Sequence, residues 1–184
     1  MSGKKTRSVP DFHGLDSPSE WVVRWAPLVT CGPVLDVASG QGRHARFFAD
    51  RGLHVTAVDR DLQSIPGVKF VQADLENSNS WPFAGQHFGA IVVTNYLHRP
   101  LLPLIAASLE ADGVLIYETF MVGNERYGKP SNPAFLLRPG ELLEAFSALT
   151  PVAFEQGIVE RPKPAVMQRI CAVRLAGGSV RIAP

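Results

Sequence analysis

Residues 34–61 have the sequence VLDVASGQGRHARFFADRGLHVTAVDRD, and this stretch decides the fold. It begins with a continuous apolar run at 34–37 and continues through a loop of small residues at 38–42. Helical spacing follows over Arg43–Arg51, and a second apolar run occupies His54–Val58. The stretch therefore predicts a strand, a helix and a second strand that is parallel to the first.

The same alternation continues on the C-terminal side of this unit. Apolar runs occupy 68–72, 89–94 and 114–119, and a helix is predicted over 100–111 with a turn at 112–113. Most of these runs are continuous, which is typical of strands that are covered on both faces of a parallel sheet. Alternating strands and helices favour a doubly wound α/β sheet with right-handed crossovers.

The last part of the sequence predicts a change of strand direction. A helix is expected from Arg138 to about residue 149, and two further apolar runs occupy 152–159 and 165–175. The five residues between those runs form too short a connection for parallel strands, so the pair is expected to be antiparallel. The predicted fold class is α/β: a doubly wound, mostly parallel seven-stranded sheet with an antiparallel C-terminal hairpin. Residues 1–184 are expected to form a single domain.

Composition limits the classes of function. The chain has 184 residues, a formal net charge of +1, 46% hydrophobic and 19% charged residues. Such a balance is typical of a globular domain and gives no long-range field toward nucleic acid or an anionic membrane. The sequence contains no apolar run of about 18–20 residues and no signal-peptide pattern, so a cytoplasmic protein is expected. The oligomeric state stays open.

Cysteine and histidine spacing gives no metal or disulfide prediction. The two cysteines, Cys31 and Cys171, are far apart in the sequence, and the five histidines show no ligand spacing. No metal site is therefore predicted.

The N-terminal part predicts a tail and one helix. Residues 1–16 are expected to be a flexible, solvated tail, and an N-terminal helix is expected over 17–30. Ser17 is the predicted cap, with Glu20 completing a capping box. An apolar stripe at helical spacing favours a core role over a substrate platform, and it comprises Trp21, Val22, Trp25 and Leu28.

Three acids stand at the ends of the first three predicted strands, in order: Asp36, Asp59 and Asp74. Ligands of open α/β sheets lie outside the carboxyl ends of the strands, so these acids are expected at one site. The small residues at 38–42 allow the backbone to approach a ligand, and the helix start offers free N–H groups. An acid after the second strand is able to accept both hydroxyls of a ribose.

A dinucleotide site is the main alternative at this loop. Gly40, Gly42 and Ala45 also satisfy the dinucleotide fingerprint, with an acid about 20 residues later. Asp36 stands at the mouth of the loop, however, and its carboxylate would repel a pyrophosphate and attract a cationic ligand. An NAD(P)-binding oxidoreductase therefore stays an alternative that is less favoured.

The order of these motifs resembles that of the class I S-adenosylmethionine-dependent methyltransferases. The motifs are VLDVASGQG at 34–42, Val58-Asp59 and Ala73-Asp74, and the resemblance extends from about residue 33 to the end of the chain. The loop at 40–43 is also similar to that of tellurite-resistance-type methyltransferases. One departure is Ala38, which stands where the family has its first glycine and which predicts a more crowded donor site.

The resemblance implies S-adenosylmethionine as the cofactor and a role for each motif. Asp36 and the backbone of 38–42 would face the methionine part, and Asp59 would hold the ribose hydroxyls. Asp74 and the Leu75 backbone would address the adenine. The predicted cofactor-binding residues are Asp36, Ala38, Ser39, Gly40, Gly42, Arg43, Asp59, Arg60, Asp74, Leu75 and Asn95.

Substrate-contacting residues are expected in two places. By the resemblance, Asn95 and Tyr96 would lie beneath the sulfonium, near the acceptor. Residues 121–138 form a long polar segment that predicts a lid or substrate loop. The candidates in the two places are Tyr96, Asn124, Arg126, Tyr127 and Arg138, and a surface loop is the alternative for the last four.

The remaining basic residues give weaker indications. Arg43, His44 and Arg46 stand near the start of a helix, where a ligand contact and an exposed helix face are equally consistent with the sequence. The C-terminal basic residues favour a solvated face over a nucleic-acid surface, and they are Arg161, Lys163, Arg169, Arg174 and Arg181.

These observations predict an enzyme that transfers a methyl group from S-adenosylmethionine to a small molecule. Residues 94–97 are Thr-Asn-Tyr-Leu rather than the Asn-Pro-Pro-Tyr of many enzymes that methylate amide or base nitrogens. A small-molecule acceptor is therefore favoured over protein or nucleic acid, and no general base is identified. A non-catalytic module that binds S-adenosylmethionine is the second alternative.

Overall fold

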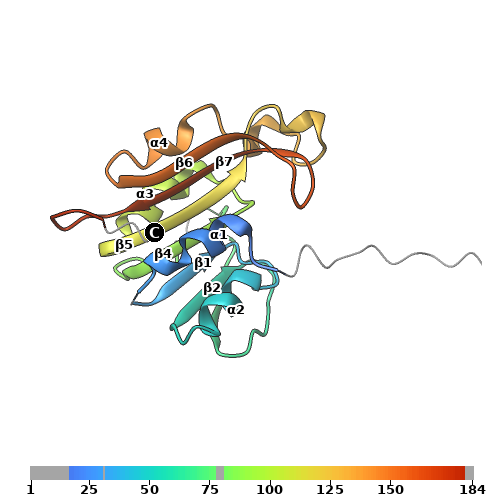
Figure 1. Ribbon diagram of the computed structural model, residues 1–184. Coiled ribbons are helices and arrows are strands. Elements are labelled where there is room, and N and C mark those ends of the chain that lie inside the picture. Colours follow the sequence, from blue (N-terminus) through green and yellow to red (C-terminus); the bar gives the residue numbers. More distant parts are fainter. Residues whose placement is uncertain (1–16, 31, 78–80, 181–184) are drawn as a thin grey trace, which may run out of the picture.

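Seven strands form one sheet in the order β3-β2-β1-β4-β5-β7-β6 (Figure 1). The computed structural model describes residues 17–30, 32–77 and 81–180. Strands β3, β2, β1, β4 and β5 are parallel, and β7 is antiparallel to both of its neighbours. The bounds are β1 Val34–Val37, β2 Val55–Asp59, β3 Val68–Gln72, β4 Phe88–Thr94, β5 Leu109–Phe120, β6 Thr150–Val159 and β7 Ala165–Val173. The predicted mixed sheet with its C-terminal hairpin is confirmed.

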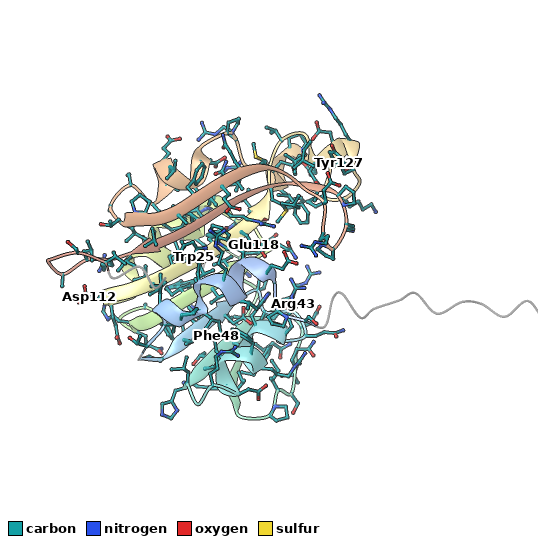
Figure 2. All side chains as sticks on the ribbon, viewed as in Figure 1. Trp25, Arg43, Phe48, Asp112, Glu118 and Tyr127 are labelled. Carbon is teal, nitrogen blue, oxygen red and sulfur yellow. The ribbon has the colours of Figure 1, made fainter. Side chains whose placement is uncertain are left out.

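Helices cover both faces of the sheet. Trp21 of α1 (Glu20–Trp25) and Phe48 of α2 (Arg43–Ala49) belong to one buried apolar cluster, against which Trp25 packs (Trp25 and Phe48 are labelled in Figure 2). Ile105 of α3 (Leu102–Ala107) and Leu142 of α4 (Glu141–Ala145) belong to a second cluster. Short 3₁₀ segments occupy Ala26–Leu28, Arg99–Leu101, Asn124–Arg126 and Pro133–Phe135. Two cores on opposite faces of one sheet confirm the doubly wound arrangement and the core role of the tryptophan stripe.

Strand β1 shows how the sequence pattern produces this packing. Its four residues are all buried, because the strand lies in the middle of the sheet between β2 and β4. Val34 packs into the cluster under α1 and α2, whereas Leu35 and Val37 pack into the opposite cluster. The alternation of faces leaves Asp36 directed toward the α2 side.

Helix α1 begins two residues later than the capping box predicts. Ser19 is the cap: its backbone is extended and its hydroxyl accepts a hydrogen bond from the Val22 amide at 3.1 Å. Glu20 is therefore the first helical residue rather than the third. The α-helix ends at Trp25 and continues as one 3₁₀ turn that contains Pro27.

The region between α3 and β5 also differs from the prediction. The helix ends at Ala107, and β5 already begins at Leu109, which is buried and pairs with Phe88 of β4. Asp112 adopts a left-handed backbone (φ 61°) within the strand, and its amide donates to the Arg174 carbonyl at 2.7 Å. The predicted turn is thus an irregularity inside a strand, held by tertiary hydrogen bonds. Helix α4 is also shorter than predicted, because it spans Glu141–Ala145 rather than Arg138 to about residue 149.

Some predictions concern residues outside the described ranges. The N-terminal tail (1–16), Cys31 and Arg181 lie there. Among the described residues, no helix has the length and apolar character to cross a membrane. In the same residues, no group of three or more His, Cys, Asp and Glu side chains gathers in a metal-binding arrangement. A cytoplasmic location stays a prediction.

Candidate functional site

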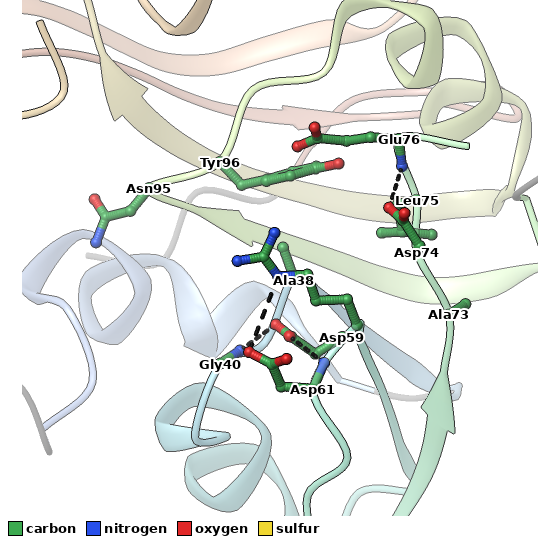
Figure 3. A pocket seen from close by; sticks show the side chains of 11 residues that line it. Ala38, Gly40, Asp59, Asp61, Ala73, Asp74, Leu75, Glu76, Asn95 and Tyr96 are labelled. Carbon is green, nitrogen blue, oxygen red and sulfur yellow. Dashed lines mark hydrogen bonds and ion pairs between the residues drawn. The ribbon is translucent and has the colours of Figure 1, made fainter. Parts of the chain in front are cut away.

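A hollow of about 380 Å³ lies at the carboxyl ends of β1, β2, β3 and β4 (Figure 3). Parallel strands bring the loops that follow them to one edge of the sheet, so this edge collects residues that are distant in sequence. Eight of the predicted site residues line the hollow together with Asp61, Ala73 and Glu76. These eight are Ala38, Gly40, Asp59, Arg60, Asp74, Leu75, Asn95 and Tyr96.

The loop after β1 is a run of left-handed turns. Ala38, Gly40 and Gly42 have φ values of 53°, 53° and 76°, and glycine adopts this region without the Cβ penalty of other residues. The Ser39 amide donates to the Val58 carbonyl, which fixes the loop against β2. A Cβ atom at Gly42 would overlap Cδ1 of Ile65, whereas a Cβ atom at Gly40 would meet nothing within 4 Å. The left-handed backbone and the nearness of Ile65 thus both favour glycine at position 42, whereas Gly40 borders open space.

Asp59 connects this loop to the end of β2. Its Oδ2 accepts a hydrogen bond from the Gly40 amide at 2.8 Å, and its Oδ1 accepts one from the Asp61 amide at 3.1 Å. No helix follows Asp59, so its carboxylate is not a helix cap. The two hydrogen bonds orient the carboxylate at the wall of the hollow.

Asp74 closes the opposite side of the hollow. Its Oδ1 accepts a hydrogen bond from the Glu76 amide at 3.0 Å, which is a local turn after β3. The Leu75 side chain is buried in the core beneath this turn. Figure 3 shows Asp74 and Asn95 on opposite sides of the hollow. The separation leaves room for an extended ligand between the ends of β3 and β4.

The hollow is strongly acidic. Its lining contains the carboxylates of Asp59, Asp61, Asp74 and Glu76 and one cation, Arg60. The Arg60 side chain is largely exposed and lies 3.9 Å from the Asp61 carboxylate. This charge distribution favours a cationic ligand and opposes the two negative charges of a pyrophosphate.

Asp36 lies behind the loop rather than in the lining. It is 1% exposed, and its Oδ2 accepts a hydrogen bond from the Ala45 amide at 3.0 Å. Burial raises the pKa of this carboxyl to about 7, against the opposing effect of the Ala45 hydrogen bond. The three predicted acids therefore separate: Asp59 and Asp74 share the hollow, and Asp36 supports the loop from below. Ser39, Gly42 and Arg43 are also outside the lining.

Asn95 and Tyr96 form the wall at the end of β4. Asn95 is exposed and left-handed (φ 55°), and its amide donates to the Glu118 carbonyl at 3.0 Å. The Tyr96 hydroxyl is buried without a hydrogen-bond partner among the described residues. Burial, followed by the charges of Glu76, Asp74 and Asp59, raises the pKa of Tyr96. The hydroxyl thus stays protonated, and it has no hydrogen-bond acceptor among the described residues.

His44 is a structural residue that the sequence did not distinguish. Its Nε2 accepts a hydrogen bond from the Ser19 amide at 3.1 Å, so the ring proton is on Nδ1, 3.4 Å from Oγ1 of Thr94. Burial, with a smaller effect of the Arg43 charge, lowers the pKa of His44 to about 3. The neutral ring joins the starts of α1 and α2 to the end of β4. The one sequence signal is its position on the buried face of α2.

Residues 121–138 do not contribute to the hollow. The Asn124 side chain is buried, donates to the Pro130 carbonyl at 3.0 Å and accepts from the Val166 amide at 3.1 Å. Arg126 and Tyr127 are exposed. Arg138 forms ion pairs with carboxylates of α4, to Glu141 at 3.4 Å and to Glu144 at 3.3 Å. The structure thus uses Asn124 and Arg138 to fix the segment beside β7 and α4, and it brings none of the four candidates to the hollow.

Comparisons with known proteins agree with this fold. Residues 35–117 match the family model described as "Methyltransferase domain". The structure of TehB from Haemophilus influenzae superposes with a TM-score of 0.69 at 17% identity, over 83% of this chain and 61% of that one. This chain therefore spans about three fifths of the TehB chain.

Two further structures contain bound ligands. A Burkholderia thailandensis 1,6-didemethyltoxoflavin-N1-methyltransferase, bound to 1,6-didemethyltoxoflavin and S-adenosylhomocysteine, has a TM-score of 0.57 at 23% identity, covering 84% of this chain and 76% of that one. The glycopeptide N-methyltransferase MtfA in complex with S-adenosyl-L-methionine has a TM-score of 0.59 at 19% identity, covering 93% and 99%. At these identities the superpositions establish a common fold, and the family resemblance predicted from the sequence is confirmed.

Proposed function

We propose that this chain, a class I S-adenosylmethionine-dependent methyltransferase by its fold and its matched segment, transfers the methyl group of S-adenosylmethionine to a small-molecule acceptor. The observation that carries the proposal is the acidic hollow at the strand ends, in which four carboxylates face one exposed arginine. S-adenosylmethionine has an ammonium, a sulfonium and no phosphate. Its charge therefore complements the hollow.

The residues present fit the cofactor in both shape and chemistry. The space beside Gly40, which a Cβ atom would enter without contact, leaves the loop backbone accessible to the methionine part. The Asp59 carboxylate is oriented for the ribose hydroxyls by the Gly40 and Asp61 amides. Asp74 and the Leu75 backbone would address the adenine. Ser39, Gly42 and Asp36 would act through the loop conformation, from positions outside the lining.

When bound, S-adenosylmethionine supplies a methyl group on a positively charged sulfur, which leaves as a neutral thioether with the electron pair of the broken bond. The task of the protein is then to hold the acceptor atom in line with that bond, and alignment of this kind contributes several kcal/mol. Tyr96 stays protonated, so it is a donor for orientation rather than a base. Asn95 and Tyr96 stand at the end of the hollow where an acceptor would enter.

Two alternatives make different predictions. A nicotinamide-dependent oxidoreductase would place a pyrophosphate among the carboxylates of Asp59, Asp61 and Asp74, which the charge of the lining opposes. A non-catalytic binding module would accept S-adenosylmethionine and release no product. The acidic lining therefore disfavours the oxidoreductase. A measurement of turnover distinguishes the enzyme from the binding module.

Calorimetric titration of the chain with S-adenosylhomocysteine and with NAD⁺ tests the proposal. We expect the affinity for S-adenosylhomocysteine to be at least about tenfold higher, which corresponds to about 1.4 kcal/mol. Tighter binding of NAD⁺ would overturn the proposal. Production of S-adenosylhomocysteine from S-adenosylmethionine, followed with panels of carboxylates, thiols, amines and metalloid oxyanions, then separates an enzyme from a binding module.

A further inference from the structure

A second hollow of about 400 Å³ lies on the α1 side of the sheet, beyond the end of β4. Its walls come from the start of α1, the end of β5 and the hairpin that joins β6 to β7. Residues 17–20 and 159–169 contribute most of the lining, although they are distant in sequence. None of the substrate candidates predicted in 121–138 takes part in it.

Asn95 belongs to the lining of both hollows. It is exposed, and its left-handed backbone is held by the hydrogen bond from its amide to the Glu118 carbonyl. Glu118 itself lines the second hollow. The two hollows therefore adjoin Asn95 at the end of β4, at the place where the acidic hollow would present the methyl group.

The two hollows have opposite charge. The second is lined by four cationic side chains, Arg43, Arg161, Lys163 and Arg169, against the carboxylates of Glu20 and Glu118. Figure 2 shows Arg43 and Glu118 near the start of α1, and Glu20 is the first residue of that helix. A net positive lining favours an anionic ligand and disfavours a cationic one.

Arg169 was predicted to lie on a solvated face, but the structure buries most of its side chain. Its side chain is only 18% exposed and lies 3.2 Å from the Glu118 carboxylate and 3.7 Å from that of Glu155. Burial raises the pKa of Glu118, against the opposing effects of the Ser19 hydrogen bond and the Arg169 charge. The pair forms a fixed, nearly neutral floor for the hollow.

The cations at the mouth are more accessible. Arg161 is 80% exposed and lies 3.6 Å from the Glu20 carboxylate, which is itself exposed. Lys163 is exposed on the same hairpin connection. Exposed pairs of this kind are weak, so an entering anion is able to replace Glu20 as the partner of Arg161.

The wall between floor and mouth is apolar. Phe120 and Met167 face each other across the β5–β7 ladder, and Val159 and Ala165 pair across the hairpin. Such a wall accommodates an organic body in contact with aliphatic and aromatic groups. A bare inorganic ion would leave it uncovered.

We infer that this second hollow is the acceptor site, and that its acceptor carries an anionic group, such as a carboxylate, on an apolar body. The inference rests on the proposed function, because only a methyl donor in the acidic hollow makes the neighbouring space an acceptor site. In this arrangement Arg161 and Lys163 hold the anionic group, and the apolar body lies against Phe120 and Met167, pointing its reacting atom past Asn95.

Three probes of one size and different charge test the inference: benzoate, benzamide and benzylamine. Their dissociation constants are measured by ligand-detected NMR on the whole chain saturated with S-adenosylhomocysteine. We expect benzoate to bind most tightly and benzylamine most weakly, with the preference for benzoate decreasing at high salt. Equal binding of the three probes would overturn the inference.

Two variants identify the residues responsible. Replacing both hairpin cations (Arg161→Gln with Lys163→Gln) is expected to weaken benzoate binding about fivefold, equivalent to two weak exposed contacts, and to leave benzamide unchanged. Arg126→Gln, an exposed arginine outside the lining, is the matched control and is expected to change neither. Unchanged benzoate binding in the double variant would contradict the placement of the anion.

The donor site provides the internal check. S-adenosylhomocysteine affinity is expected to stay within about twofold in both variants, since Arg161, Lys163 and Arg126 are outside the acidic hollow. Absence of S-adenosylhomocysteine binding in the unmodified chain would refute the proposed function and the acceptor site with it. Normal binding without selectivity for benzoate would refute the acceptor inference alone.

Discussion

The carboxylate of Asp59 holds the amide of Gly40 at 2.8 Å, across the gap between the end of β2 and the loop after β1. We predict that Asp59→Ala weakens S-adenosylhomocysteine binding by about 1–3 kcal/mol, the scale of hydrogen bonds to a charged group. The variant removes the carboxylate that is predicted to accept hydrogen bonds from the ribose hydroxyls, and it also removes the partner of the Gly40 amide. Calorimetric titration measures the change.

Two comparisons separate these effects. Asp59→Asn keeps an oxygen for the Gly40 amide and loses the charge, so an intermediate loss of affinity is expected. Asp50→Ala, at an exposed acid after α2, is expected to leave the affinity unchanged. An unaltered dissociation constant in Asp59→Ala would remove Asp59 from the site.

The two glycines of the loop are predicted to respond differently to alanine. Gly42→Ala places a methyl group against the Ile65 side chain at a φ of 76°, so a loss of stability of about 2–4 kcal/mol is expected from overpacking and backbone strain together. Gly40→Ala meets no neighbour within 4 Å, so only about 1 kcal/mol of strain is expected. Its methyl group enters the hollow instead, and S-adenosylhomocysteine binding is expected to weaken more than stability does. Urea unfolding and calorimetry give the two quantities, and the same ranking in both measurements would contradict the assignment.

Ala38 is a strained residue where the family has glycine. A φ of 53° destabilises the folded state of an L-residue by about 1–2 kcal/mol, and glycine would remove this strain. Glycine would also make the unfolded chain more flexible, which lowers stability by about 0.5–1 kcal/mol. Ala38→Gly is therefore expected to raise the free energy of unfolding by about 0.5–1 kcal/mol, with S-adenosylhomocysteine bound at least as tightly. Ala73→Gly is the matched control in the same lining and is expected to destabilise the protein, because Ala73 has no left-handed backbone. Destabilisation by Ala38→Gly would show that the methyl group is needed for packing.

Asp36 is predicted to make the protein less stable as pH rises. Its pKa is about 7 in the folded chain against 3.8 normally, so the folded state keeps a proton that the unfolded state loses in this range. Asp36→Asn retains an oxygen for the Ala45 amide and has no such titration. The stability of the variant relative to the natural chain is expected to increase between about pH 4 and pH 7 and to level off above, by at most roughly 4 kcal/mol. Urea unfolding at pH 5 and pH 8 measures it, and a constant difference would contradict the buried, titrating carboxyl.

His44 is predicted to act in the opposite direction. Its pKa is about 3 in the folded chain against 6.5 normally, so the unfolded state binds the extra proton and stability falls as pH decreases from 6.5 toward 3. His44→Gln keeps an oxygen acceptor for the Ser19 amide and does not titrate. At pH 7 the variant is expected to be about 1–2 kcal/mol less stable, and the deficit is expected to shrink at pH 5. A deficit that grows in acid would show that the ring is charged in the folded protein.

Much of the fold was predictable because its signals are local. The continuous apolar runs in β1 to β5 and the short hairpin connection predicted the strands, the mostly parallel sheet and its antiparallel end, whereas the order of the strands comes from the structure. Asp59 and Asp74 were also predictable, because parallel topology alone brings the ends of β2 and β3 to one edge. The element boundaries were less accurate where long-range hydrogen bonds decide them, as at Asp112 and Arg174.

The rest of the site depends on contacts that sequence spacing does not encode. Asn124 stands in a polar segment that is typical of a surface loop. Its side-chain amide nevertheless forms hydrogen bonds with the Pro130 carbonyl and the Val166 amide. Asp36 and Asp59 both stand at strand ends in the predicted motifs. The alternation of faces in β1 nevertheless directs Asp36 beneath the loop, whereas Asp59 lines the hollow. The second hollow joins residues near 20 with residues near 160, and no pattern in either segment indicates the other.

The position of Asn95 between two oppositely charged spaces has an evolutionary consequence. The acidic hollow is lined by residues at the ends of the first four strands, whereas seven of the fifteen residues that line the second hollow belong to the C-terminal hairpin and its connection. Under the inferred placement of the acceptor, substitutions in residues 159–165 change which compound is modified and leave the residues that line the acidic hollow unaltered. Diversification by drift in one hairpin requires no new domain, and it leaves the central part of the chain under separate selection.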